Sequence, residues 1–397
     1  MVEFRHHRRW LVAVGAGLVL LCLGSTRASS RPPVDEEPPY PVDADAWAAT
    51  GLKAVRGVTI GPIENQLHRG HGYGSPACAD TMTYLKELGA NWVSLTVFGR
   101  VWDLRPSGVA SRFEAPYRAN QRSVAAAVDQ AHAAGLRVLL VPHLWVESGD
   151  WRGLIDPKSD EDWRGFAESY EDFVDGWAKV AARAGVDMMA IGVELRSWAT
   201  GNRAPLLLGI IERMRKLYPG PLTYAANWDD VHDTVLWSSL DVIGINAFFP
   251  LADKPGASDD QLLARAEKIS VEVGQLAARW KRPVLFTEFG YTTRKDPSVR
   301  PWEWPEDLGN VTVDQVDQAR AYRALLTPFI KKPWFVGVFV WRVYADLEDT
   351  SQEPEWGFSP NGKLAERELR EAFLAHWGAD GRRFIGDSLG RWTVYRH

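Results

Sequence analysis

The stretch PVLFTEFGYTT, residues 283–293, is a short apolar run that ends on a carboxylate and then breaks at a glycine. Val284, Leu285 and Phe286 have the composition of a strand in a parallel sheet, which is buried on both faces and therefore apolar throughout. Glu288 stands where this strand should end. A carboxylate there is rarely buried without a partner, so it either pairs with a neighbouring arginine or belongs to a functional site.

The chain repeats this construction at residues 187–194, where an apolar run ends on Gly192, Val193 and Glu194. Two carboxylates in different environments are the minimum requirement for cleaving a glycosidic bond. One protonates the leaving oxygen while the other attacks the sugar or activates water. The pair therefore favours a functional site over two separate ion pairs.

Apolar runs of about five residues alternate with longer helical patterns from residue 54 onward, a rhythm typical of β/α units around a parallel sheet. Eight strands are predicted at residues 55–60, 92–97, 137–141, 188–191, 222–226, 241–245, 284–287 and 335–340. Eight helices are predicted at residues 77–88, 121–134, 160–184, 205–218, 234–239, 259–279, 313–330 and 362–377.

Eight strand–helix pairs predict an α/β protein with a (β/α)₈ TIM barrel, whose active site lies at the carboxyl ends of the strands. The alternative is an open doubly wound sheet. Residues 57–61, GVTIG, lack the G-x-G-x-x-G spacing, so nucleotide binding has no support. The composition, with 397 residues of which 46% are hydrophobic and 24% charged, fits one domain of barrel size with tails.

The amino terminus has the layout of a secretory signal: Arg5, Arg8 and Arg9, then an apolar run at 10–24, then small residues up to Ala28. We expect a signal peptide at 1–28, a Pro- and acid-rich linker at 29–50, a barrel domain at 51–377 and a tail at 378–397. The chain is thus expected to be secreted, periplasmic or exposed on the cell envelope, with an uncleaved anchor as the alternative.

Removing residues 1–28 takes away four basic residues and one acidic residue, which changes the formal net charge from −5 to −8. A secreted acidic chain is a poor candidate for binding nucleic acid. Cys78 would be the only cysteine left, so no internal disulfide is expected. Nothing in the sequence implies a protein partner.

Aromatic, amide and basic residues follow the predicted strands, all on one face of the barrel. Indole rings cover the C–H faces of sugars, while amides, histidine and arginine bond the hydroxyls, so this mixture suits a glycan. The candidate substrate-binding residues are Arg100, His143, Trp145, Trp151, Asn227, Trp228, Asn246, Phe248, Tyr291 and Trp341.

Each candidate also has a plainer interpretation. A tryptophan can be loop or core packing, and an asparagine can form a turn. Arg100 is expected to hold the Glu288 carboxylate ionised, with a surface ion pair as the alternative. His143 is expected to be an oriented, neutral histidine rather than a catalytic base.

Other chemistries find little support. His68 and His71 form an H-x-x-H in a glycine-rich loop without an acidic or cysteine cluster, so neither a catalytic metal nor a cofactor is expected. The segments at 149–151 and 192–194 are not G-x-S-x-G, which argues against a serine hydrolase.

Eight segments together resemble glycoside hydrolase family 113, retaining β-mannanases in clan A of the barrel glycosidases. The segments are RGVTIGP (56–62), LGANWVSL (88–95), HLWVESGDWRGLI (143–155), IGVELRSW (191–198), YAANWDDV (224–231), DVIGINAFFPL (241–251), LFTEFGYTT (285–293) and PWEW (301–304).

The resemblance implies Glu194 as acid/base and Glu288 as nucleophile, acting through a covalent intermediate on β-linked glycans, in particular β-1,4-mannan. For these roles the pKa of Glu194 should be raised, and donors should hold Glu288 ionised. Two positions depart from the pattern: Val193 replaces an asparagine that contacts the sugar's 2-hydroxyl, and Phe248 replaces a tyrosine.

The sequence thus predicts a retaining glycoside hydrolase that needs no metal or cofactor. The rival interpretation is a barrel that has kept the sugar cleft but lost turnover, serving as a glycan-binding protein at the cell surface. Phe248 favours the rival, because a phenol that would bond the nucleophile is missing, whereas the presence of both glutamates favours the enzyme.

Overall fold

The computed structural model describes residues 54–61, 70–111, 116–304, 311–349, 351, 353–376, 384–386 and 392–394. All the described residues belong to one compact unit. The expected signal peptide and linker lie outside the described residues, as does most of the expected tail. Across the described ranges, no helix is both long and apolar enough to cross a membrane.

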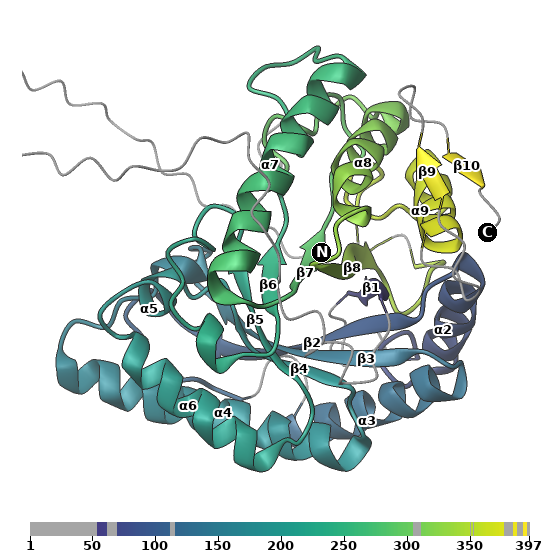
Figure 1. The fold of residues 1–397 in the computed structure, drawn as a ribbon. Coiled ribbons are helices and arrows are strands. Elements are labelled where there is room, and N and C mark those ends of the chain that lie inside the picture. The colour runs from purple at the N-terminus through teal and green to yellow at the C-terminus, as the bar shows by residue number, and fades with distance from the viewer. Residues whose placement is uncertain are drawn as a thin grey trace, which may run out of the picture. The chain divides into compact units, whose positions relative to one another are not determined.

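Eight parallel strands form a closed barrel in sequence order, with β8 pairing back onto β1 (Figure 1). This confirms the predicted (β/α)₈ barrel. The strands are β1 (Val55–Ile60), β2 (Trp92–Val101), β3 (Arg137–Val146), β4 (Met188–Val193), β5 (Leu222–Asn227), β6 (Ile243–Asn246), β7 (Val284–Phe289) and β8 (Phe335–Val343).

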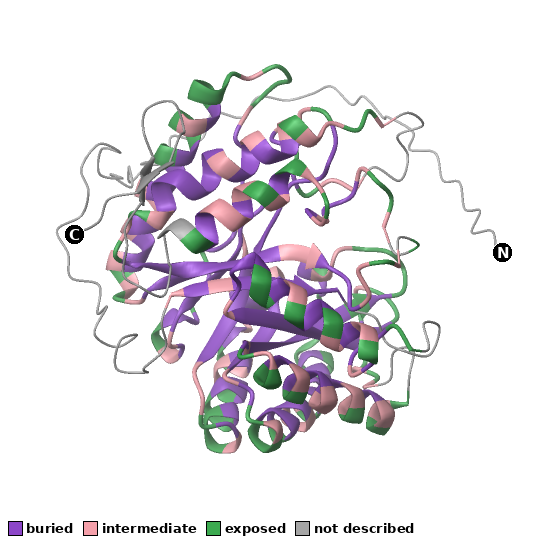
Figure 2. Cartoon of the chain, turned by 90° about the vertical axis from the view of Figure 1, so that its right-hand side faces the viewer, coloured by how far each residue is buried: buried purple, intermediate pink, exposed green. Residues whose placement is uncertain are grey.

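Helices surround the barrel and bury one side each against it, while their outer sides are exposed (Figure 2). The α-helices are α2 (Pro76–Leu88), α3 (Tyr117–Ala133), α4 (Asp160–Ala184), α5 (Arg196–Ala199), α6 (Ala204–Leu217), α7 (Asp259–Trp280), α8 (Gln315–Ile330) and α9 (Leu364–His376). A 3₁₀ turn, η1 (Arg152–Leu154), precedes α4. Near the carboxyl terminus, β9 (Phe384–Gly386) pairs antiparallel with β10 (Trp392–Val394).

The helix predicted at residues 234–239 is wrong. Only a 3₁₀ turn, η2 (Trp237–Ser239), occupies this connection between β5 and β6. Trp237 is fully buried and its indole N–H donates to the carbonyl of Val231 at 3.2 Å. The buried ring of Trp237 anchors this short segment as a compact loop. Six residues are too few to form a stable helix on their own.

The strands are apolar on both faces because each face packs against a different cluster. Leu285 points into the barrel with eleven other side chains, among them Trp92, Val193 and Phe339. Its neighbour Phe286 belongs to the larger cluster between barrel and helices. Side chains alternate across a strand, so a strand buried on both sides reads as a continuous apolar run.

Serine side chains begin several of the helices. Ser75 caps α2, and both Ser159 at α4 and Ser258 at α7 form reciprocal capping boxes. Gly89 and Gly185 end α2 and α4, with φ values of 103° and 73° that favour glycine. These signals explain why the boundaries of α2 and α4 could be predicted closely.

Candidate active site

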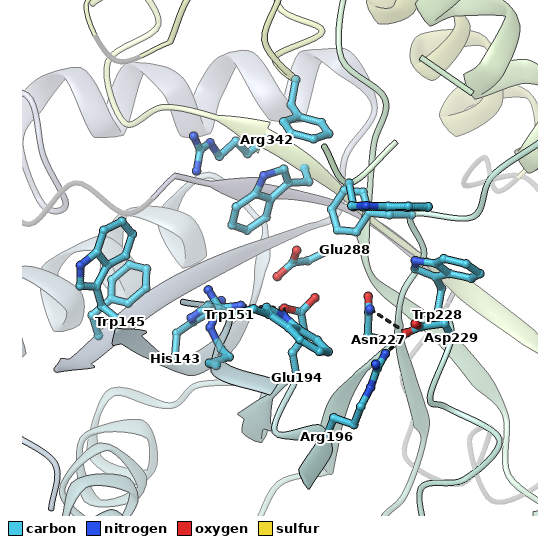
Figure 3. Close-up of a pocket in the computed structure, with 16 residues that line it drawn as sticks. His143, Trp145, Trp151, Glu194, Arg196, Asn227, Trp228, Asp229, Glu288 and Arg342 are labelled. Carbon is cyan, nitrogen blue, oxygen red and sulfur yellow. Dashed lines mark hydrogen bonds and ion pairs between the residues drawn. The ribbon is translucent and has the colours of Figure 1, made fainter. Parts of the chain in front are cut away.

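A cavity of about 660 Å³ opens at the carboxyl ends of the barrel strands (Figure 3). Carboxylates, arginines and aromatic rings line it: Phe98, His143, Trp145, Trp151, Arg152, Glu194, Arg196, Asn227, Trp228, Asp229, Phe248, Glu288, Trp302, Trp341, Arg342 and Phe358. Glu194 and Glu288, from strands far apart in sequence, therefore share one cavity.

Glu194 follows β4 in a left-handed backbone conformation, with φ of 52°, which few residues other than glycine adopt. Its own N–H donates to the carbonyl of Ala225 at 2.8 Å. The next N–H, that of Leu195, donates to the hydroxyl of the buried Tyr224 at 2.7 Å. Strain of this kind occurs at functional sites and persists only where neighbouring structure holds it, as these two hydrogen bonds do.

Three N–H donors converge on the Glu194 carboxylate. Trp151 Nε1 and one guanidinium nitrogen of Arg152 donate to Oε2, at 2.9 and 2.7 Å, and Asn246 Nδ2 donates to Oε1 at 3.0 Å. The Asn246 amide is oriented by the Thr287 hydroxyl, which donates to its Oδ1 at 3.0 Å. Both oxygens of Glu194 are therefore bonded inside the cavity.

Glu288 lies in β7, and like Glu194 it is only 8% exposed. Burial, followed by the nearby Glu194 carboxylate, raises the pKa of Glu288 well above its usual range, although Arg152 and Arg342 act in the opposite direction. The expectation that donors hold Glu288 ionised is therefore wrong for the free protein. A hydrogen bond from Asn246 also lowers the pKa of Glu288, but this is the smallest of the effects, and Trp151 and Arg152 donate to Glu194 instead.

Arg100 does not have its expected partner. Its Nε pairs with Glu147, and the arginines whose charges act on Glu288 are Arg152 and Arg342. β2 continues past the barrel rim and carries Arg100 two residues, or about 7 Å, beyond Phe98, which does line the cavity. The ion-pair interpretation of Arg100 is the one that the structure bears out.

Arg342 follows Trp341 on β8 and its guanidinium lies 5.0 Å from the ring centres of both Trp341 and Tyr344. Its Nε is 3.4 Å from the buried carboxylate of Glu353. A cation held between two ring faces and a carboxylate is restricted in position. Arg342 thus brings a fixed positive charge close to Glu288.

Arg196 connects the acidic residues after β5 to Trp151. It forms ion pairs with Asp229 and, at 3.0 Å, with Asp230, and its guanidinium lies 4.5 Å from the Trp151 ring centre. Burial raises the pKa of Asp230 to about 6, although Arg196 lowers it. Asn227 Nδ2 donates to Asp229 at 2.8 Å, which places its amide at the edge of this network.

Aromatic rings stand at both ends of the cavity. Trp145 lies on one side of the two glutamates and Trp228 on the other (Figure 3). Trp228 stacks on Trp302, with ring centres 5.3 Å apart. Phe248 packs edge-on against Phe358 at 5.7 Å. The cavity is therefore an elongated cleft with apolar faces at its ends and charged groups at its centre.

Most of the sequence-predicted residues meet at this cleft. Those that line it are His143, Trp145, Trp151, Asn227, Trp228, Phe248 and Trp341. Asn246 reaches it through its bond to Glu194. His143 lies within β3, and burial, then the charge of Arg152, lowers the pKa of its imidazole well below 6.5, so that a neutral ring is favoured as expected.

Tyr291 is the exception. Its side chain is fully buried, and its hydroxyl donates to the carbonyl of Phe249 at 2.8 Å. Its own carbonyl accepts from Gln318 of α8 at 2.9 Å. The chain turns inward after Gly290 and packs Tyr291 beside Tyr322, away from the cleft. The prediction that Tyr291 binds substrate is therefore wrong.

Seven cleft residues were not among the candidates: Phe98, Arg152, Arg196, Asp229, Trp302, Arg342 and Phe358. Three of them, Arg152, Asp229 and Arg342, directly follow a candidate in the sequence. Including one more residue after each candidate would have found them. Trp302 lies in the quoted PWEW segment, but its loop joins β7 to α8, and only folding brings it onto Trp228.

Among the residues that the structure describes, no group of three or more histidine, cysteine or acidic side chains is placed to hold a metal ion. His71 pairs through Nδ1 with Asp346, and His68 lies outside the described ranges. Cys78 is buried in α2, where burial raises the pKa of its thiol to about 11.

A family profile and two similar solved structures name the same family. No protein with curated function matches this chain in sequence. Among solved structures, the GH113 β-mannanase from Alicyclobacillus acidocaldarius is 26% identical, with a TM-score of 0.68 over 82% of this chain and 98% of that one. A GH113 β-1,4-mannanase is 21% identical, with a TM-score of 0.67 over 81% and 99% of the two chains, which supports the fold alone.

The family profile described as Glycoside Hydrolase Family 113 matches residues 65–363. That range includes both strand-end glutamates and all sixteen residues that line the cleft. Because the match covers more than half of the sequence, this chain belongs to Glycoside Hydrolase Family 113.

Proposed function

We propose that this glycoside hydrolase cleaves β-1,4-linked mannan with retention of configuration, using Glu194 as acid/base and Glu288 as nucleophile. The observation that carries the proposal is the pair of buried carboxylates at the ends of β4 and β7, at the centre of an aromatic-lined cleft. The choice of mannan is supported by the similar protein from Alicyclobacillus acidocaldarius, which is named a β-mannanase.

The reaction would proceed in two displacements. A carboxylate oxygen of Glu288 attacks the anomeric carbon, the bond to the leaving oxygen breaks, and Glu194 gives that oxygen its proton. Glu194 then takes a proton from water, whose oxygen attacks the anomeric carbon and releases Glu288. Two inversions give net retention, and the proton balance is restored after each cycle.

The proton must first reach Glu194. In the free protein, burial favours the protonated form of Glu288, while Trp151, Arg152 and Asn246 donate to Glu194. A sugar in the cleft would place its leaving oxygen at Glu194 Oε2 and displace the Arg152 contact. The shared proton would then move from Glu288 to Glu194, which leaves Glu288 ionised for attack.

The two departures from the family pattern bear on transition-state binding. Val193 is buried in the barrel interior, so its side chain makes no contact with the cleft. Asn227 lines the cleft and is our candidate for contacting the 2-hydroxyl. Phe248 packs against Phe358 and both rings line the cleft, so this part of the cleft is apolar.

Hydrolysis of β-1,4-mannooligosaccharides tests the proposal. The wild-type chain should release products whose anomeric proton signals first appear in the β form, and both Glu194→Ala and Glu288→Ala should lose about 10³-fold or more in kcat. Products that first appear in the α form would contradict retention. Unchanged activity in either variant would remove that residue from its assigned role.

A catalytically inactive glycan-binding barrel is the second candidate, and the apolar surroundings of Phe248 favour it. It would be supported if the wild-type chain bound mannan but hydrolysed it no faster than Glu288→Ala. If mannan is neither bound nor cleaved, another β-linked glycan is the substrate. The panel should therefore include cellooligosaccharides and xylooligosaccharides.

We also propose that residues 1–28 direct export, so that the enzyme meets its substrate outside the cytoplasm. The basic, apolar and small-residue order of this segment supports the proposal. Amino-terminal sequencing of the exported protein should begin at Ser29. A mature protein that starts at Met1 and remains with the cells would favour an uncleaved anchor or a cytoplasmic location.

A further inference from the structure

β2 and β3 extend beyond the barrel rim as a two-stranded ribbon. Each has ten residues, whereas β4 and β7 have six. In the outer half of the ribbon, Phe98 is level with His143 and Arg100 is level with Trp145. Backbone pairing continues past the strand ends, since Ser148 N donates to the carbonyl of Trp102 at 3.1 Å.

One face of this ribbon continues the wall of the cleft. Phe98, His143 and Trp145 line the cleft. Arg100 lies two residues after Phe98 in β2, so alternation along the strand places it on the same face. Trp102 follows Val101, the last residue of β2, and its ring contacts the Arg100 guanidinium. Exposure grows along this face: His143 is buried, Trp145 is 45% exposed, and Trp102, furthest out, is 65% exposed.

The Trp102 ring is held in place. The Arg100 guanidinium lies 5.8 Å from its centre, and Arg100 Nε forms an ion pair with Glu147 in the turn that follows β3. An indole ring has more apolar surface than most side chains, so covering an exposed indole with a ligand is favourable. An indole that is both supported and exposed, one step beyond the cleft, is suited to bind a ligand.

The position of the ribbon fits a chain-like ligand. Figure 3 shows Trp145 at one side of the cleft and Trp228 at the other, with Glu194 and Glu288 between them. The ribbon therefore starts at the Trp145 end and leads away from the reacting carboxylates. A polymer held at the centre of the cleft and leaving past Trp145 would pass over Trp102 next.

We propose that Trp102 and Trp145 form a sugar-binding platform that takes β-linked pyranose units of a glycan chain beyond those held next to the two glutamates. The C–H faces of the sugars would stack on the two indoles. The identity of the sugar rests on the proposed function, but the platform itself does not. Such a site favours long chains over short ones, as an enzyme that cuts within chains requires.

Chain-length dependence tests the platform. The measured quantity is kcat/KM on β-1,4-mannohexaose divided by kcat/KM on an aryl β-mannoside. Trp102→Ala should lower this ratio about tenfold, the size expected for loss of one stacking contact, and Trp102→Phe should restore part of it. An unchanged ratio in Trp102→Ala would overturn the platform. The sugar units far from the two glutamates would then gain their binding free energy from residues other than Trp102.

Trp280→Ala is the matched control. Trp280 ends α7 away from the cleft, and the Arg279 guanidinium lies 5.4 Å from its ring centre, so it forms a cation–ring pair as Trp102 does, although its ring is half-buried against the core. The ratio should stay at the wild-type value in this variant. A fall as large as in Trp102→Ala would mean that loss of any such pair impairs the enzyme, and would count against the platform.

A binding experiment separates failure of the platform from failure of the mannanase proposal. In the Glu288→Gln background, binding of mannohexaose, cellohexaose and xylohexaose can be measured by calorimetry without turnover. Adding Trp102→Ala should weaken the tightest of these about tenfold, whichever sugar it is. If the added substitution changes no affinity, or if none of the three hexasaccharides binds, the platform is wrong even where mannan hydrolysis is observed.

Discussion

Glu194 and Glu288 share one cleft but meet different neighbours. Three N–H groups donate to Glu194, whereas burial and the charge of Glu194 oppose ionisation of Glu288. Two buried carboxylates this coupled titrate as a pair, and which one holds the proton depends on what else occupies the cleft. The environments of the two groups are thus tuned by tertiary contacts rather than by their local sequence.

The raised pKa of Glu288 has a consequence for stability. An acid whose pKa is raised by folding contributes stability that is fully present below its unfolded pKa and lost as pH rises through its folded pKa. At pH 7, Glu288→Gln should therefore raise the free energy of unfolding by about 1–2 kcal/mol in urea denaturation, a gain typical of removing a destabilising functional group. Below about pH 4.5 the gain should disappear.

Glu212→Gln provides the control for this prediction, because Glu212 is an exposed carboxylate on α6. Its stability should differ little from wild type at either pH. A Glu288→Gln chain that is less stable than wild type at pH 7 would show that the carboxylate makes net favourable contacts in the folded state.

Arg152 should set the pH range of activity. Its guanidinium bonds Glu194 at 2.7 Å and its charge lowers the pKa of Glu288. Arg152→Gln removes a positive charge that favours loss of protons from the coupled Glu194–Glu288 pair. Both limbs of the pH profile of kcat/KM should therefore move to higher pH by about one unit. Arg152→Lys keeps a cation there and should keep the profile closer to wild type.

A purely structural role for Arg152 would give a different result. Activity would then fall by the same factor at every pH, and the limbs would not move. The two outcomes are distinguished by a profile measured on one substrate between about pH 4 and 9.

At the scale of elements, strand length decides what each strand contributes to the site. β4 and β7 stop after six residues and leave Glu194 and Glu288 at the rim. β2 and β3 run on for ten residues and carry Arg100 and Trp145 outward. Two strands therefore supply the two buried glutamates, while the other two form a wall of the cleft.

The helix packed beside β4 helps to hold the backbone at its end. Tyr170 of α4 donates its hydroxyl to the carbonyl of Ile191 at 2.8 Å, three residues before Glu194. The start of α4 is fixed by a capping box, in which Ser159 Oγ accepts from the N–H of Asp162 at 3.1 Å and Asp162 accepts from the N–H of Ser159. The cap therefore stabilises an element that supports the site.

Ser159→Ala should lower the free energy of unfolding by about 1 kcal/mol, because N–H groups at the start of α4 lose their side-chain acceptor. Urea denaturation measures this loss. Ser238→Ala is the comparison, since Ser238 is an exposed residue of η2 and should change stability by less than about 0.5 kcal/mol. Equal stabilities of the two variants would mean that the cap is not needed in the folded protein.

At the scale of the whole molecule, the barrel exists only if β8 pairs with β1. These strands are about 280 residues apart in sequence, and their register places Gly337 beside Val55. Gly337 has φ of 140°, and a Cβ atom built there would lie 2.0 Å from the carbonyl oxygen of Val55. Closure therefore depends on a position that has no side chain.

Gly337→Ala should lower the free energy of unfolding by at least about 2 kcal/mol, since both the backbone conformation and the close contact oppose a methyl group. Gly209→Ala in α6 is the matched substitution, because no described heavy atom lies within 4 Å of its Cβ position. It should raise stability by about 0.5–1 kcal/mol. If Gly337→Ala were as stable as Gly209→Ala, closure would tolerate a side chain at this contact.

The sequence by itself determined the barrel and the positions of the two strand-end glutamates. Buried parallel strands are apolar on both faces, so their positions were visible as continuous apolar runs. The residue that follows or ends each run can then be read directly from the sequence. Glu194 and Glu288 were found in this way, as were most of the rings that line the cleft.

Only the tertiary structure decided how these residues are paired and charged. Whether Arg100 or Arg152 reaches the glutamates depends on how far β2 extends, and whether Tyr291 faces the cleft or the core depends on packing against α8. The raised pKa of Glu288 likewise arises from burial and from a carboxylate 94 positions away in the sequence. These properties depend on distance and solvent exclusion between segments remote in the chain, which the order of residues does not specify.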